Sequence, residues 1–126
     1  MRRSIAFLVA TCGDEARAGT IGARAVHYQA WKDTSPVPTA TVHAELGTKH
    51  MRGQELLAAG MLRPAHLLEL LRSFTVFMTA EGRRYKAIAR YQQFRAVHLA
   101  TARLRTGKLR VPGGDPDRRG GIIWHT

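Results

Sequence analysis

The residues best suited to chemistry lie in a basic helical segment, RYQQFRAV at residues 90–97, which precedes a loop and an apolar segment, GGIIWHT at residues 120–126. ATPase cores commonly use this order, in which a strand leads into a glycine-rich loop whose amides hold phosphate at the next helix N-terminus. A glutamine upstream can both donate and accept a hydrogen bond at the edge of adenine. The pattern is therefore compatible with a nucleotide site, although a glutamine on an amphipathic helix usually faces solvent. The alternative is that the glutamines face solvent on an amphipathic helix.

Other catalytic patterns are incomplete. The chain has six histidines, but none has metal-ligand spacing with cysteine or carboxylates. A metal-dependent nuclease needs an aspartate followed by Glu-x-Lys. Asp33 and Glu45 have a suitable separation, but no lysine stands two residues after Glu45, and an arginine stands at that position after Glu81. We therefore expect no catalytic residue and no metal ligand in this chain.

The positive charge is concentrated in the last third of the chain. The formal net charge is +11, with nine Lys/Arg against seven Asp/Glu in residues 1–82 and eleven against two in residues 83–126. Such a basic segment suits a polyanion, such as nucleic acid, ATP or an anionic surface. The alternative is a solvated face in an arginine-rich protein.

Length and apolar patterning place the protein among small soluble chains. Its 126 residues suffice for one small domain or two partial ones. No apolar run approaches the roughly 18–20 residues that cross a bilayer. The basic start and the apolar residues 5–10 resemble a signal peptide, but Asp14 and Glu15 replace a small-residue cleavage site. With Cys12 as the single cysteine, we expect a cytoplasmic protein with no membrane contact.

The elements that would position these residues are predicted from apolar spacing and turn residues. Residues 4–10 form a continuous apolar run that predicts a buried strand, and residues 16–26 alternate as a second strand that pairs with it. Prolines at 36 and 38 predict a loop, and residues 54–59 have helical propensity up to a cap at Gly60.

The second half of the chain carries stronger helical patterns. Residues 63–74 predict a helix with Pro64 in its first turn. The segment at 74–77 either continues this helix or begins an extended piece. A turn at 81–83 leads to a short strand at 85–89, and residues 90–105 predict a second helix. The predicted buried stripes are Leu67, Leu71 and Phe74 on the first helix, and Phe94, Val97, Thr101 and Leu104 on the second. Residues 120–126 predict a strand, apolar enough for the centre of a parallel sheet.

Two of these segments resemble a known family. GGIIWHT at residues 120–126 resembles the strand before the Walker A loop in the restriction (R) subunits of type I restriction–modification enzymes. RYQQFRAV at residues 90–97 resembles the helicase Q-motif region of the same family. Gln93 matches the motif glutamine, because Arg90 lies three residues before it and Ala96 three after it.

Upstream segments extend the resemblance in the family's order. Residues 60–77 resemble the helix before the motor domain, and residues 9–32 resemble the end of the nuclease domain. The resemblance implies an α/β fold made of partial domains. Residues 1–33 would end a restriction-endonuclease-like nuclease domain, residues 34–62 would form a linker and short helix, and residues 63–126 would form the N-terminal edge of a RecA-like P-loop helicase domain.

The family also implies a function. Its intact R subunit couples ATP hydrolysis to translocation on double-stranded DNA and cleaves that DNA with Mg²⁺, as part of a complex with methyltransferase and specificity subunits. In that setting Gln93, together with Arg90, would contact adenine. The family's nuclease carboxylates would lie before residue 1 and its Walker A lysine after residue 126. The chain is therefore expected to be an inactive fragment that binds neither ATP nor Mg²⁺ tightly.

Three alternatives remain open. Instead of an R-subunit fragment, the chain could be a small basic DNA-binding module, an interaction module that docks on an acidic partner, or the edge of another superfamily 2 helicase. The basic residues of 83–119 would contact ATP or DNA, or face solvent.

Overall fold

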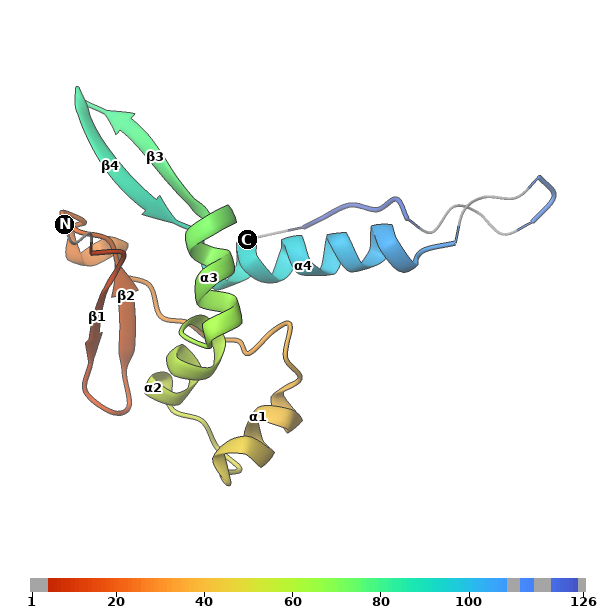
Figure 1. Ribbon diagram of the computed structural model, residues 1–126, viewed down its shortest axis with the longest axis horizontal. Helices are drawn as coiled ribbons and strands as arrows, with labels where there is room; N and C mark the ends of the chain where they lie inside the picture. The colour runs from red at the N-terminus through yellow and green to blue at the C-terminus, as the bar shows by residue number, and fades with distance from the viewer. Residues whose placement is uncertain (1–4, 109–111, 115–118, 125–126) are drawn as a thin grey trace. The chain divides into compact units, whose positions relative to one another are not determined.

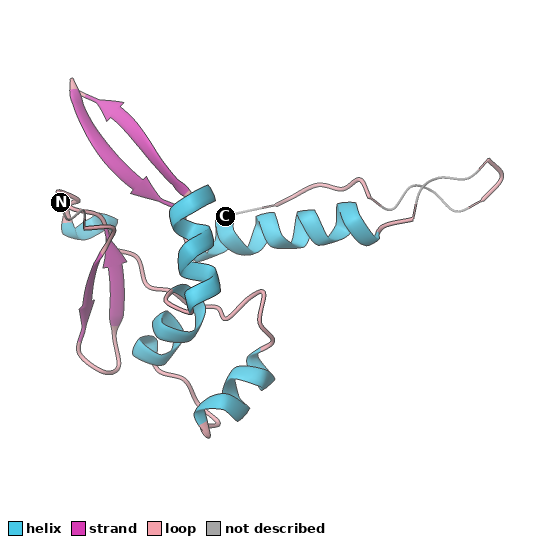
Figure 2. Ribbon diagram, viewed as in Figure 1, coloured by secondary structure: helices cyan, strands magenta, loops and turns pink. Residues whose placement is uncertain are grey.

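The computed structural model describes residues 5–108, 112–114 and 119–124 of the chain (Figures 1 and 2). The protein is mixed α/β, and the described residues form four α-helices and two small antiparallel sheets of two strands each. Residues 1–91 and 92–126 form two compact units, which are described separately. The elements are β1 (Leu8–Thr11), β2 (Ala16–Gly19), α1 (Thr39–Leu46), α2 (Gly53–Leu56), α3 (Pro64–Ser73), β3 (Thr75–Ala80), β4 (Arg83–Ile88) and α4 (Tyr91–Thr106), with a 3₁₀ turn at Ala25–His27 and a π-helical turn at Leu57–Met61.

The predicted pairing of the first two strands is confirmed, but both strands are shorter than expected. β1 and β2 are antiparallel, with Leu8 opposite Gly19 and Thr11 opposite Ala16. β2 ends before Gly22, whose φ of 77° places it in the left-handed region that glycine adopts without strain. The predicted burial of the first strand is wrong, since Val9 is 44% exposed. A two-stranded sheet covers neither of its own faces, so a strand in it is buried only where another element packs on it. In the described chain β1 is exposed along its length, whereas three of the four residues of β2 are buried.

Helix α1 occupies a stretch for which the sequence indicated no element. It begins after Pro38 and ends at Gly47, which adopts the left-handed conformation with φ 63°. A glycine in this conformation is a common helix C-terminus, because the amide can return to an earlier carbonyl. Here the Gly47 amide bonds to the carbonyl of His43. Val42 is fully buried and anchors the helix.

Gly60 does not cap a helix as predicted. α2 continues into the π-helical turn, which includes Gly60 and ends at Met61. The glycine is required for close packing, because a Cβ at this position would lie 2.2 Å from the Asp33 carbonyl oxygen and 2.4 Å from Cδ1 of Trp31. The helix can therefore approach the loop at residues 31–33 only where no side chain intervenes.

Helix α3 has the predicted position, with Pro64 at its first residue, but the predicted buried face is wrong. Its buried residues are His66 and Leu70, four positions apart, whereas Leu71 is 41% exposed. His66 donates from Nδ1 to the Gly60 carbonyl at 2.6 Å. This bond joins the His66 side of the helix to the preceding π-helical turn, while Leu68 and Leu71 on the more apolar face are exposed.

Of the segment at residues 74–77, Phe74 is the C-cap of α3, and residues 75–77 are extended and begin β3. β3 and β4 pair along their full length, from Thr75 opposite Ile88 to Ala80 opposite Arg83. Glu81 and Gly82 connect them with φ values of 51° and 71°, and two positive φ values are typical of the tightest hairpin turn. Thr20, at the end of β2, donates to the Lys86 carbonyl at 2.7 Å and so joins β2 to β4.

Helix α4 confirms the predicted helix at residues 90–105, but its predicted apolar stripe is only partly buried. Phe94 is fully buried, while Val97 and Leu104 are 47% and 62% exposed. The strand predicted at residues 120–126 is not observed in residues 120–124, and residues 125–126 lie outside the described ranges. Ile122 and Trp124 are 94% and 87% exposed. The two sheets of the described chain pair only β1 with β2 and β3 with β4, so residues 120–124 add no strand to either of them.

Candidate functional site

The two residues predicted to contact a nucleotide lie at the start of α4. Arg90 stands just before the helix and Gln93 in its first turn, and both are exposed. The first turn carries no acidic residue. Because the amides at a helix N-terminus favour negative charge, this end of α4 is electrostatically compatible with an anionic ligand.

The neighbouring Gln92 was not selected by sequence reasoning, yet its environment is unusual. Its Oε1 is buried and has no hydrogen-bond partner among the described residues. A buried amide oxygen without a partner is costly, so such an atom is a candidate contact for a ligand or water. The sequence offers no signal that distinguishes the two adjacent glutamines in this respect.

The positive charge continues from the second hairpin through α4. Between Gly82 and Gly114 the sequence contains no aspartate or glutamate. The described cations of this stretch are Arg83, Arg84, Lys86, Arg90, Arg95, Arg103, Arg105 and Lys108, and all except the half-buried Lys86 are exposed. Exposed cations without neighbouring carboxylates in the sequence suit a polyanionic ligand.

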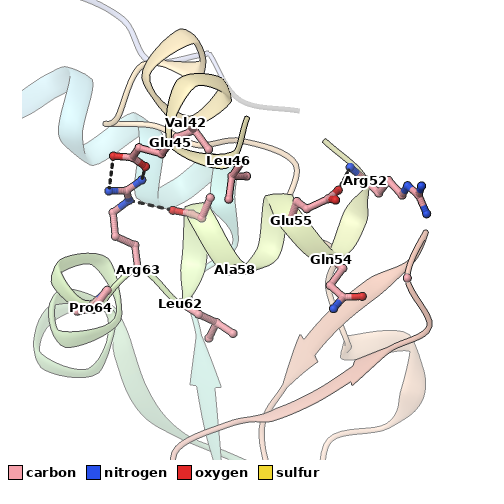
Figure 3. A pocket seen from close by; sticks show the side chains of 12 residues that line it. Val42, Glu45, Leu46, Arg52, Gln54, Glu55, Ala58, Leu62, Arg63 and Pro64 are labelled. Carbon is pink, nitrogen blue, oxygen red and sulfur yellow. Dashed lines mark hydrogen bonds and ion pairs between the residues drawn. The ribbon is translucent and has the colours of Figure 1, made fainter. Parts of the chain in front are cut away.

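A pocket of about 550 Å³ lies between α1, the α2 segment and Gly13 of the first hairpin turn (Figure 3). Its charged residues are bonded to one another. Arg63 donates to both carboxylate oxygens of Glu45 and, from Nε, to the carbonyl of Ala59 at 3.4 Å. The hydrogen bond from Arg63 lowers the pKa of Glu45 below its ordinary value. Glu45, which the sequence placed near a nuclease pattern, thus pairs with Arg63.

The other side of the pocket has its own bonded charges. The Arg52 amide donates to the Glu55 carboxylate at 2.5 Å, and the Arg52 guanidinium lies 3.5 Å from Asp14. The ion pair of Glu45 with Arg63 therefore joins α1 to the residue before α3, and that of Asp14 with Arg52 joins the first hairpin turn to the residue before α2. Within the ranges that the structure describes, no three His, Cys, Asp or Glu residues gather in a way that could hold a metal ion.

Membrane insertion has no structural support in the described helices, none of which is long and apolar enough to cross a bilayer. Comparison of the chain with protein-family models, with curated proteins and with solved structures finds no match. The functional assignment consequently depends on the residues and their geometry.

Proposed function

We propose that this chain carries the part of a type I restriction enzyme R subunit that joins the nuclease domain to the first RecA-like motor domain. The observation that carries the proposal is the placement of RYQQFRAV, because it begins a 16-residue helix and leaves Gln93 exposed in the first turn. An exposed glutamine amide presents both a donor and an acceptor, which are the groups that the edge of adenine requires.

The order of elements agrees with this proposal. The nuclease-like segment at residues 9–32 contains the β1–β2 hairpin, and the segment at 60–77 contains α3 and the start of β3. Under the proposal, residues 1–33, 34–62 and 63–126 belong to the nuclease end, the linker and the motor edge. The RecA-like assignment of the last part is supported by the resemblance of its sequence to that family.

In the intact enzyme this chain would supply adenine contacts from Gln93 and Arg90. ATP and Mg²⁺ would act with residues that this chain does not contain, since its sequence has no Gly-Lys-Ser/Thr phosphate loop. The partners would be double-stranded DNA and the methyltransferase and specificity subunits. The cellular compartment would be the cytoplasm.

The genomic sequence that follows codon 126 tests the proposal directly. We expect it to encode a glycine-rich loop with Lys-Ser or Lys-Thr, either in frame or after a frameshift. Unrelated sequence at that point would overturn the assignment, and a phosphate loop in a different sequence context would instead favour another superfamily 2 helicase.

A biochemical test uses the intact subunit with matched substitutions. Gln93→Ala removes both adenine hydrogen bonds and is expected to weaken ATP binding about tenfold. Gln92→Ala is the comparison variant, because the buried Oε1 of Gln92 lacks a partner among the described residues and is itself a candidate ligand contact. A tenfold loss in Gln92→Ala with none in Gln93→Ala would show that the wrong glutamine was assigned.

A small basic DNA-binding module is the second candidate, and the acid-free stretch from residue 82 to 114 favours it. Such a module would bind duplex DNA as the isolated chain, with an affinity that falls steeply with salt. It would do so whether or not a phosphate loop is encoded downstream. An interaction module for an acidic partner would instead bind acidic peptides and leave DNA unbound.

A further inference from the structure

The β3–β4 hairpin has two chemically different faces. Residues directly opposite each other in an antiparallel pair lie on the same face, and residues two apart along a strand share it. Phe77 pairs with Lys86 and Thr79 with Arg84, so these four side chains occupy one face. The opposite face carries the apolar residues Val76, Met78, Tyr85 and Ala87, and at its turn end Ala80 and the cation Arg83.

Phe77 stands among cations on its face. The Arg84 guanidinium carbon lies 4.6 Å from the centre of the Phe77 ring, and Lys86 Nζ lies 6.0 Å from it. Lys86 also donates to the Ile5 carbonyl at 3.2 Å, which uses one of its three N–H groups. Within the described chain no carboxylate pairs with Arg84, and Glu81 in the turn is the one acidic residue of the hairpin sequence. The face is therefore aromatic and cationic.

The exposure of Phe77 requires an explanation. Its side chain is 60% exposed although it is large and apolar. An exposed aromatic ring beside guanidinium and ammonium groups suits nucleic acid, because the ring can stack on a base while the cations contact the phosphates.

We propose that this face of the β3–β4 hairpin binds an unpaired strand of nucleic acid, with a base stacked on Phe77 and Arg84 and a phosphate held by Arg84 and Lys86. A duplex covers the faces of its bases by stacking them on one another, so it cannot use the ring. The inference rests on the proposed function in taking DNA as the partner, and it adds a second contact surface, distinct from Gln93, that needs no ATP.

The test measures binding of the purified 126-residue chain to fluorescent oligonucleotides by anisotropy, without ATP. The single strand is oligothymidine of about 20 nucleotides, which lacks internal pairing, and the comparison is a duplex of the same length. Phe77→Leu keeps an apolar side chain but removes the ring, and Phe77→Tyr keeps the ring. Lys49→Gln is the charge control, because Lys49 is an exposed cation in the loop after α1.

We expect the wild-type chain and Phe77→Tyr to bind oligothymidine more tightly than duplex. Phe77→Leu should weaken oligothymidine binding about tenfold while leaving duplex binding nearly unchanged. Lys49→Gln should lower the affinities for oligothymidine and for the duplex slightly and by the same factor. Circular dichroism verifies that each variant retains its fold, and Arg84→Gln provides a second reading of the same site, with a loss of about fivefold or more for the single strand.

The proposal is overturned if the wild type and folded Phe77→Leu bind the single strand equally, or if the duplex binds more tightly than the single strand. It is also overturned if polyglutamate displaces the DNA and Phe77→Leu weakens polyglutamate binding as much as it weakens single-strand binding. The last result would assign the face to an acidic protein. None of these outcomes bears on the sequence downstream of codon 126, so failure here and failure of the proposed function are separable.

Discussion

Glu45 and Arg63 form a two-pronged ion pair that joins the last turn of α1 to the residue before α3 (Figure 3). Nη1 of Arg63 lies 3.3 Å from Oε1 of Glu45, and Nη2 bonds to Oε2. Arg63 also donates to the Ala59 carbonyl in the π-helical turn. The Arg63 guanidinium therefore connects α1 and the π-helical turn to the residue that precedes α3.

The ion pair between Glu45 and Arg63 should make the stability of the folded chain depend on pH. Arg63 lowers the folded-state pKa of Glu45 below the ordinary 4.5. A depressed carboxyl pKa stabilises the folded state above the unfolded-state pKa, and this contribution is lost as the pH falls through the folded-state value. At neutral pH, Glu45→Gln should therefore melt slightly below the wild type, and the difference should disappear in acid.

The size of this effect is limited by solvent, because the Glu45 side chain is 46% exposed. Thermal melts at low and high salt check this, since salt should reduce the difference. Glu15→Gln is the control, as its pair with Arg17 has a longer separation of 3.7 Å and more exposed partners. A difference between wild type and Glu45→Gln that grows as the pH falls below 4.5 would contradict the assignment.

Gly60→Ala should be strongly destabilising. The added methyl would lie 2.2 Å from the Asp33 carbonyl oxygen and 2.4 Å from the Trp31 ring, so the loop or the helix must move. We expect a loss of about 2 kcal/mol or more in urea unfolding. Gly120→Ala is the matched control, because no heavy atom lies within 4 Å of its Cβ position. Equal stability of the two variants would show that Gly60 is not a point of close packing.

Thr20 is predicted to stabilise the attachment of the second hairpin. Its side chain is 5% exposed and its hydroxyl donates to the Lys86 carbonyl. Thr20→Val has nearly the same shape but leaves that carbonyl without its donor, so it should lower the free energy of unfolding by about 1–2 kcal/mol. Thr20→Ser keeps the hydroxyl and should lose less. The prediction fails if serine and valine are equally destabilising.

The purified chain is expected to show no ATP hydrolysis. The sequence contains no Gly-Lys-Ser/Thr loop to hold the phosphates, so Gln93 and Arg90 could at most contact adenine. A phosphate-release assay checks this against a Gln93→Ala control. Turnover by the wild type well above that control would mean that the chain holds a catalytic site of its own.

Local signals in the sequence were sufficient for the turn at residues 81–83 and for the two long helices, whereas the first strand of the second hairpin stayed open, because residues 74–77 could also continue the helix. Pro64 marks the start of α3, and Gly82 marks the β3–β4 turn, because each restricts the backbone at its own position. Gln93 and Arg90 were likewise selected from the residues on either side of them, through the resemblance of residues 90–97 to the Q-motif region. Their proposed role remains a prediction.

Burial and cross-strand contacts could not be predicted in the same way. The buried side of α3 carries His66, which bonds to the Gly60 carbonyl, and the apolar residues 120–124 form no strand. The contact between Phe77 and Arg84 depends on the register of β3 with β4. By itself the sequence determined the start of α3, the turn at residues 81–83 and the extent of α4, because those preferences act within a few residues. Only the tertiary structure decided which faces are covered and which side chains meet, because those outcomes require partners that are distant in the chain.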